Sequence, residues 1–261
     1  MAEKRRLWTQ EELIVVFNLY LKMPFGQMNR TDPRVIKMAQ LVDRTPSSIA
    51  MRLGNFASVD PYHINRGIKG LQGGMNQVKP IFELYSNDKE NFTYESELLL
   101  AKLEGETVEH KFKEEIEILD SIEGKTVDRL VKTRVNQSVF RKIVLNNYEY
   151  KCAISGIDLP ELLVASHIVP WAKDEKNRMN PCNGISLNNL YDNAFDRGFI
   201  SFDSETRLIL AEILEKSTSD SILKLFKNIK GQKLTTPERF VPLPDFLDYH
   251  RNYIFQDSIK L

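Results

Sequence analysis

The chain has 261 residues, of which 42% are hydrophobic, and its 36 Lys and Arg residues balance its 36 Asp and Glu residues. This length accommodates two small domains with cores of their own, and the composition is that of an ordinary globular protein. The two cysteines lie far apart, which excludes a four-cysteine zinc site and argues against a disulfide framework. No apolar run approaches membrane-spanning length, and the N-terminus lacks the apolar stretch of a signal peptide. We therefore expect a reduced, cytoplasmic protein.

The charge is segregated along the chain although its sum is zero. Residues 1–83 hold twelve Lys and Arg against seven Asp and Glu, residues 84–128 hold five against thirteen, and residues 129–151 hold six against one. Basic blocks beside a candidate catalytic segment suit a polyanionic partner. We expect a helical domain over 1–83 and an acidic helical connector over 84–128 that acts as a solvated spacer.

The N-terminal block predicts three helices, each with a capping residue before a periodic apolar segment. Thr9 caps the first, and Asp32 and Thr45 cap helices that begin with proline. The second and third helices, with Arg44 and Arg52 near the third, resemble a helix-turn-helix that sits on a DNA duplex. A compact helical domain that only packs is the alternative, and the sequence leaves both open.

Two stretches follow these helices. Residues 62–80 are rich in glycine and predict a loop or linker, without the strand and Gly-Lys-Ser/Thr sequence of a nucleotide-binding loop. From about residue 92 to residue 122 the pattern is helical. Its apolar face consists of Phe112, Ile116, Leu119 and Ile122. That face either packs on the body of the protein or pairs with a second subunit.

Residues 162–203 read LLVASHIVPWAKDEKNRMNPCNGISLNNLYDNAFDRGFISFD and predict a strand, a polar loop, a second strand and a helix. His167 ends the first strand, and Asn183 precedes the second. Asp192 and Asp196 are four residues apart on the helix, so both carboxylates project from one face. A histidine, an asparagine and an acid are therefore expected to converge on one point.

The segments ASHIVPW, NPCNGISL and AFDRGFISFD resemble one branch of the HNH endonuclease family. The resemblance extends through RVNQSVFRKIVLNNYEYKCAISG upstream and to FLDYHRNYIF downstream, and RTPSSIAMRLGNFASVDP is also similar to proteins of this branch. It implies an α+β protein in which a helical N-terminal domain and the connector precede a C-terminal ββα-metal (HNH) nuclease domain over 129–261.

The resemblance implies a role for each matching residue. His167 matches the catalytic histidine and Asn183 the central asparagine, while Asp192 stands where many relatives have a histidine that binds metal. Some relatives carry an acid before the catalytic histidine, and Ser166 stands at that position here. Because one possible metal ligand is thereby missing, Asp196 becomes more important as a second ligand. Asp196 is either that ligand or a scaffold acid that pairs with a neighbouring arginine. The metal implied is Mg²⁺, with Mn²⁺ or Ni²⁺ as substitutes, because carboxylates suit hard cations.

The expected function is that of a metal-dependent DNA endonuclease of restriction or antiviral defence. Replacement of His167, the expected base, is the most direct test of this function. A catalytically inactive HNH-fold protein that binds DNA is the alternative, motivated by the missing helix histidine, and RNA is a lesser possible substrate. Double-stranded cleavage by single-strand cutters suits a homodimer, whereas a monomer makes independent nicks. The residues expected to contact nucleic acid are Arg44, Arg52, Arg134, Gln137, Arg141 and Lys142.

Overall fold

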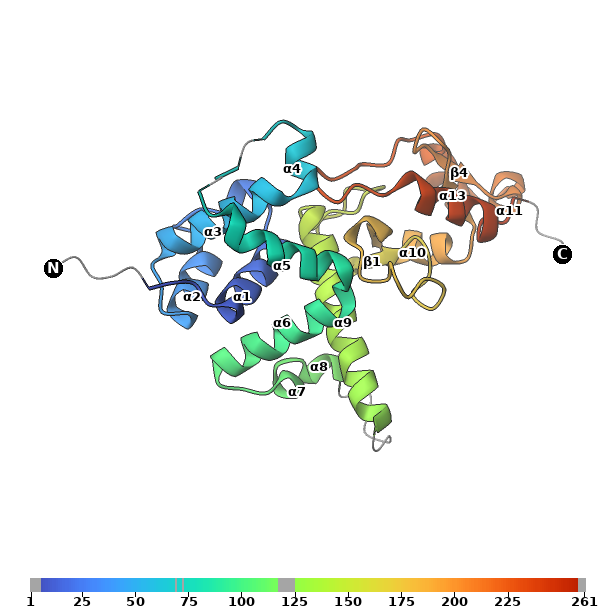
Figure 1. Ribbon diagram of the computed structural model, residues 1–261. Coiled ribbons are helices and arrows are strands. Elements are labelled where there is room, and N and C mark those ends of the chain that lie inside the picture. Colours follow the sequence, from blue (N-terminus) through green and yellow to red (C-terminus); the bar gives the residue numbers. More distant parts are fainter. Residues whose placement is uncertain (1–5, 69, 72, 117–124, 258–261) are drawn as a thin grey trace. The chain divides into compact units, whose positions relative to one another are not determined.

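The computed structural model describes residues 6–68, 70–71, 73–116 and 125–257 (Figure 1). The chain divides into two compact units, Met1–Val139 and Phe140–Leu261. The division falls within one long helix, α9 (Lys125–Asn147), which supplies residues to both units. The acidic segment expected to act as a connector contributes its described helices to the first unit.

The first unit is helical, and its helices begin where capping residues predict. The helices are α1 (Gln10–Leu21), α2 (Pro33–Leu41), α3 (Pro46–Val59), α4 (Pro61–Asn65), α5 (Met75–Asn87), α6 (Lys89–Glu104), α7 (Val108–Lys111) and α8 (Lys113–Ile116), with a 3-10 turn at Phe25–Gln27. At α1 the Thr9 hydroxyl accepts from the backbone N–H of Glu12, whose carboxylate accepts from the Thr9 N–H. Asp32 and Thr45 cap α2 and α3. These three predicted helix starts are confirmed.

The core of the first unit forms around α1, which packs against α3, α5 and α6. Phe17 on α1 lies at its centre, with ring centroids 4.8 Å from Phe56 and 5.2 Å from Tyr85. The buried carboxylate of Glu97 on α6 pairs with Lys22 and with Lys111. Burial alone would raise the pKa of Glu97, but the two lysines lower it to about 2. Apolar packing and one compensated buried charge thus hold these helices together.

The structure corrects the expected loop over residues 62–80. Residues Pro61–Asn65 form α4, and α5 begins at Met75 and contains Pro80. The buried face of α5 (Val78, Ile81 and Tyr85) packs on α3, and this tertiary contact outweighs the local preference of glycine and proline. A Cβ atom at Gly74, just before α5, would meet the side-chain ends of Asn55 and Arg52 of α3, which would then have to shift.

The helical pattern expected from about 92 to 122 is present in the described residues, where it is divided among α6, α7 and α8. The chain leaves α6 at Gly105, whose φ of 78° is the left-handed value typical of a glycine that ends a helix. Phe112 is 1% exposed and belongs to the core of its own unit, so it offers no surface to a second subunit. Leu119 and Ile122 lie outside the described residues. The proposed dimer face is therefore not supported by its first member.

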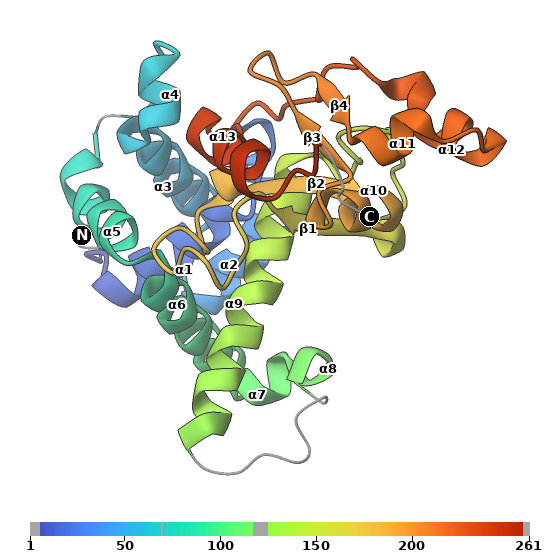
Figure 2. The same ribbon diagram turned by 90° about the vertical axis from the view of Figure 1, so that its right-hand side faces the viewer.

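The second unit contains two small antiparallel sheets and several helices. Its elements after α9 are β1 (Leu163–His167), β2 (Gly184–Asn188), α10 (Asn189–Asp196), β3 (Ile200–Phe202), β4 (Leu208–Leu210), α11 (Glu212–Lys216), α12 (Asp220–Leu225) and α13 (Pro244–Tyr253), with 3-10 turns at Pro160–Leu162, Pro181–Asn183 and Lys227–Ile229. β1 pairs with β2 so that His167 lies opposite Gly184. α10 packs against both strands (Figure 2). The α+β class and the strand, strand, helix order are confirmed.

Two glycines permit close packing around this hairpin and helix. A Cβ atom on Gly184 would lie 2.5 Å from Val144 and 2.8 Å from Phe140, so glycine lets the end of α9 approach β2. Gly198 ends α10 with a φ of 70°, and a Cβ atom there would overlap the carbonyl of Ile254. The segment after α13 therefore packs on the end of α10. Among the described helices, none is long and apolar enough to cross a membrane.

Candidate active site

His167 lies at the end of β1, where its imidazole is fixed on three sides. Its Nε2 is 2.9 Å from the carbonyl oxygen of Arg178 in the loop that follows. The ring stacks on Phe140 of α9, with centroids 4.0 Å apart and planes 14° apart, and it forms a T-shaped contact with Trp171, whose ring centroid is 5.4 Å away. Two aromatic contacts and one hydrogen bond therefore set the orientation of the ring.

The hydrogen bond also determines which nitrogen of the His167 ring carries the proton. A carbonyl oxygen accepts and cannot donate, so Nε2 is the protonated nitrogen and neutral His167 has its lone pair on Nδ1. Burial lowers the pKa of His167, and the bond to Arg178 opposes this in part. The ring is therefore neutral at neutral pH and presents an acceptor nitrogen.

Asn183 is fully buried and closes the loop between β1 and β2. Its Oδ1 accepts from the backbone N–H of Val169 at 2.8 Å, and its Nδ2 donates to the carbonyl of Val169 at 3.1 Å. The backbone carbonyl of Asn183 also accepts from Ile168 at 3.0 Å. Its side chain therefore joins the two ends of the loop and fixes the backbone that follows His167.

Asp192 and Asp196 lie one turn apart on α10. Burial raises the pKa of Asp192. The buried hydroxyl of Ser166 makes no hydrogen bond of normal geometry, and it lowers the pKa of Asp192 only weakly. The pKa of Asp196 is raised to about 6, first by partial desolvation and then by the charge of Asp192, even though Asp196 is exposed on the helix. Two neighbouring carboxylates, of which Asp192 raises the pKa of Asp196, form a site whose repulsion a cation would relieve.

The donor set of this pair fits a hard divalent cation. Carboxylate oxygens are the ligands that such ions prefer, and water completes the coordination sphere of Mg²⁺ in many protein sites. Within the described ranges neither acid makes an ion pair, so the expected scaffold contact of Asp196 with Arg178 or Arg197 is not observed. No cluster of three or more His, Cys, Asp or Glu side chains that could hold a metal occurs in the same ranges.

The arginines expected to contact DNA from the first unit are engaged within that unit. The Arg44 guanidinium forms an ion pair of 2.8 Å with Glu12 and lies 4.5 Å above the ring of Trp8. Arg52 lies 4.9 Å above the same ring and donates to Asn55. Both arginines therefore pack the N-terminal segment, and their role in DNA binding stays a prediction.

The residues expected to contact DNA from α9 differ in their surroundings. Arg134 donates to Gln137 at 3.3 Å. Arg141 donates to the carbonyls of Leu163 at 2.6 Å and Pro160 at 3.1 Å, so it supports the start of β1. Lys142 is exposed.

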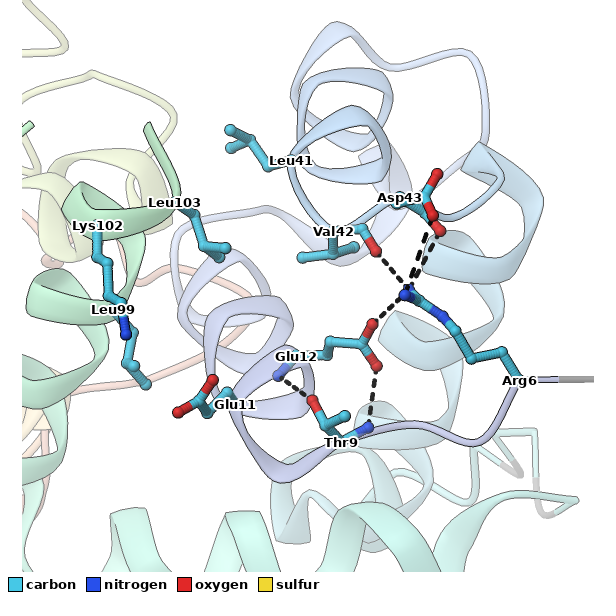
Figure 3. A pocket seen from close by; sticks show the side chains of 10 residues that line it. All are labelled: Arg6, Thr9, Glu11, Glu12, Leu41, Val42, Asp43, Leu99, Lys102 and Leu103. Atoms are coloured by element: carbon cyan, nitrogen blue, oxygen red, sulfur yellow. Dashed lines mark hydrogen bonds and ion pairs between the residues drawn. The ribbon is translucent and has the colours of Figure 1, made fainter. Parts of the chain in front are cut away.

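A separate pocket of about 260 Å³ lies in the first unit, between the N-terminal end of α1, the end of α2 and the last turns of α6 (Figure 3). Leu41, Val42 and Leu103 form much of its apolar wall. Arg6 and Glu12 at its edge bond to one another at 2.6 Å, and Arg6 also donates to the carbonyl of Val42. None of the residues expected to act in catalysis lines it.

Sequence reasoning missed three contributors to the site. Phe140 provides the stacking surface for His167, Trp171 makes a second ring contact with it, and Arg178 contributes its backbone carbonyl. A signal for Phe140 existed, because the glycine after Asn183 predicts that another segment approaches β2 closely. No side-chain pattern identifies a backbone carbonyl as a ring partner.

A search of curated proteins found no match to the chain. The model of a family described as HNH endonuclease matches residues 152–203. This range includes β1, the loop, β2, α10 and β3, and with them His167, Asn183, Asp192 and Asp196. Residues 152–203 of the second unit therefore form an HNH endonuclease domain.

Proposed function

We propose that the protein is a divalent-metal-dependent endonuclease that hydrolyses the phosphodiester bonds of double-stranded DNA, with a role in restriction or antiviral defence. The observation that carries this proposal is His167, which is neutral and held with Nδ1 open, in an HNH hairpin beside two acids on α10. The defence role rests on the resemblance of the sequence to restriction-type members of the family.

The proposed reaction begins with a water molecule that donates a hydrogen bond to Nδ1 of His167. As its oxygen attacks phosphorus, the proton passes to Nδ1 and the bond between phosphorus and the 3′ oxygen breaks. The 3′ oxygen leaves with the bonding electron pair and takes a proton from solvent water, which gives 5′-phosphate and 3′-hydroxyl ends. The resulting imidazolium keeps its Nε2 hydrogen bond to the Arg178 carbonyl, so the ring does not rotate during proton transfer. Phe140 and Asn183 maintain this geometry from the helix and from the loop.

Asp192 and Asp196 would hold the cation, with Mg²⁺ as the expected ion. A divalent ion supplies positive charge for the transition state and for the leaving 3′ oxygen. The pair of acids has a second consequence, because without a cation it would repel a polyanionic substrate. DNA binding is therefore expected to depend on the cation as well as on basic side chains.

Lys142 and Arg134 are the proposed phosphate contacts on α9. Replacement of either by alanine should weaken binding to all DNA sequences alike and reduce its salt dependence. Arg141 differs, since it also holds the carbonyls of Pro160 and Leu163. Its replacement by alanine should lower thermal stability together with affinity.

The direct test is incubation of the purified protein with plasmid, phage and modified DNA in the presence of Mg²⁺, Mn²⁺ or Ni²⁺. Cleavage that is absent in a His167→Ala preparation, with ends mapped by sequencing, would support the proposal. Intact DNA under all conditions would refute it. RNA of the same sequence serves as a further substrate in the assay, and sedimentation with and without DNA distinguishes a homodimer from a monomer that makes nicks.

A second candidate, an inactive HNH-fold protein that binds DNA, is favoured by Ser166 and Asp192, which stand where many relatives have a metal ligand. Calorimetry discriminates the two candidates without an activity assay. Divalent binding that is lost in Asp192→Ala supports the endonuclease, and no binding with intact DNA affinity supports the inactive protein.

A further inference from the structure

The loop between β1 and β2 contains a repeat of polar residues at every third position, at Asp174, Asn177, Asn180 and Asn183. The backbone follows the same period. The N–H of Asn177 donates to the carbonyl of Asp174 at 3.3 Å, that of Asn180 to Asn177 at 2.9 Å, and that of Asn183 to Asn180 at 2.8 Å. The loop is therefore a chain of three successive turns, each beginning where the last one ends.

Side chains connect these turns to one another. The Asp174 carboxylate accepts from both the backbone N–H of Asn177, at 3.1 Å, and its Nδ2, at 2.7 Å. Asn180 Nδ2 lies 3.4 Å from Asn177 Oδ1, and Asn180 Oδ1 accepts from the N–H of Cys182 at 3.2 Å. Asn183 Nδ2 lies 3.5 Å from the Asn177 carbonyl. All four polar groups of Asn177 are thus bonded within the loop, which makes it the centre of the network.

Arg178 directly follows this centre. It is the second residue of the turn from Asn177 to Asn180, so its carbonyl takes no part in the hydrogen bond that closes the turn. That carbonyl instead accepts the proton on Nε2 of His167. The position of the Arg178 carbonyl depends on the peptide bond before Arg178 and on the peptide bond after it. The Asn177 network holds the peptide bond before Arg178.

We propose that Asp174 and Asn177 are positioning residues of the nuclease, which hold the Arg178 carbonyl against His167 and so keep the lone pair of the base on Nδ1. This inference rests on the proposed role of His167 as the base. Neutral imidazole exists as two tautomers, and the partner of one nitrogen selects between them. When the carbonyl moves away, the Nδ1–H tautomer becomes populated, and that form cannot accept a proton from the attacking water at Nδ1.

The first experiment observes the tautomer directly and requires no DNA. Protonated and unprotonated imidazole nitrogens differ strongly in 15N chemical shift. The chain has 4 histidines, and the His167 signals are assigned as those that are missing from the spectrum of His167→Ala. At a pH above the pKa of His167, the wild type should show the Nε2–H form. Asn177→Ala should show a mixture with the Nδ1–H form, whereas Lys176→Ala, an exposed change in the same loop, should match the wild type.

The second experiment reverses one hydrogen bond. Asn177→Asp places two carboxylates against each other and should disturb the tautomer as Asn177→Ala does. The double variant Asp174→Asn, Asn177→Asp restores a donor and an acceptor in the opposite order and should recover the wild-type spectrum. In cleavage assays the single variants should lose about 10–100-fold in kcat with little change in KM, and the double variant should recover most of it.

The outcomes separate this inference from the proposed function. If the wild type cleaves no DNA but the variants change the His167 tautomer as expected, the endonuclease proposal is refuted. The positioning role of the loop then still stands. A wild type in the Nδ1–H form, or an Asn177→Ala protein that folds and keeps the wild-type tautomer, would overturn the inference itself. Thermal unfolding of each variant establishes that the compared proteins are folded.

Discussion

The end of β1 and the last turn of α13 bury a histidine in nearly the same way. His167 stacks on Phe140 with centroids 4.0 Å apart, and His250 stacks on Phe195 with centroids 3.6 Å apart. In both rings Nε2 donates to a backbone carbonyl, that of Arg178 at 2.9 Å or that of Phe195 at 3.0 Å. Burial lowers the pKa of both, that of His250 to about 4.

The two histidines differ at Nδ1. In His250 this nitrogen accepts from the hydroxyl of Ser201 at 2.9 Å, and the residue is only 1% exposed. No hydrogen bond within the described part of the chain reaches Nδ1 of His167, which is half-buried. His250 therefore has both ring nitrogens bonded within the fold. His167 keeps Nδ1 as an acceptor for another molecule. The open nitrogen, more than burial or a shifted pKa, distinguishes the histidine for which we propose a catalytic role.

The comparison is tested most strongly by His167→Ala. Removal of a general base should lower the cleavage rate by about 10²–10⁴-fold, while the fold and the affinity for DNA change little, because other groups supply the phosphate contacts. Cleavage kinetics and binding titrations measure the two quantities. A variant that keeps substantial cleavage would remove His167 from the mechanism, whatever its surroundings.

His250→Ala should have the opposite profile. It removes a buried aromatic ring and leaves the Phe195 carbonyl and Ser201 without their partner, so the free energy of unfolding should fall by about 3–5 kcal/mol. Denaturant unfolding measures the change. Tyr253→Ala, at a residue that is 75% exposed on the same helix, is the matched control and should stay within about 0.5 kcal/mol of the wild type. Lost cleavage in a fully folded His250→Ala protein would contradict the division of roles.

The same contrast explains how much was predictable. The capped helix starts at Thr9, Asp32 and Thr45 followed from local rules, because those rules depend on neighbours in the sequence. The hairpin and α10 followed from the pattern around His167 and Asp192, which also carries the family resemblance. Rules that depend on sequence neighbours thus predict which helix or strand a residue belongs to and which chemical group it provides there.

Contacts between distant segments were not predictable in this way. Phe140 reaches His167 from 27 positions away because Gly184 admits α9, and Arg44 is drawn to Trp8 and Glu12 by the packing of the first unit. The helix at Met75 likewise depends on its burial against α3. Such partners follow from the three-dimensional arrangement, and a single sequence does not specify which of many apolar or charged residues will meet.

Acid should expose the cost of keeping His250 neutral. Its pKa is lowered to about 4 in the folded protein from an ordinary value of 6.5, so the unfolded chain takes up the proton first as the pH falls. The stability contributed by neutral His250 is present above pH 6.5 and is lost between 6.5 and about 4, which amounts to about 3 kcal/mol. Unfolding curves at a series of pH values should show this loss in the wild type and a smaller one in His250→Gln. Equal losses in both proteins would assign the acid sensitivity to other groups.

The smallest effect is expected at Asp196, which extends the comparison from rings to carboxylates. Its pKa is raised to about 6 from an ordinary value of 3.8, so its charged form destabilises the folded protein, and this penalty is absent below about pH 4 and complete above pH 6. Because Asp196 is exposed, solvent screens most of the effect. Without divalent cations, Asp196→Asn should therefore raise the melting temperature by about 1–2 °C at pH 8 and leave it unchanged at pH 4.

Divalent cation should reverse the sign of the Asp196→Asn effect. An ion that binds only the folded state stabilises it in proportion to its affinity, so Mg²⁺ at pH 8 should raise the melting temperature of the wild type more than that of the variant. A functional site that keeps unsatisfied bonding capacity costs stability until its ligand arrives, whereas His250, with both nitrogens bonded, carries no such cost. A variant that melts lower than the wild type without cation would show instead that Asp196 supports the fold, and the two-acid site would lose its physical basis.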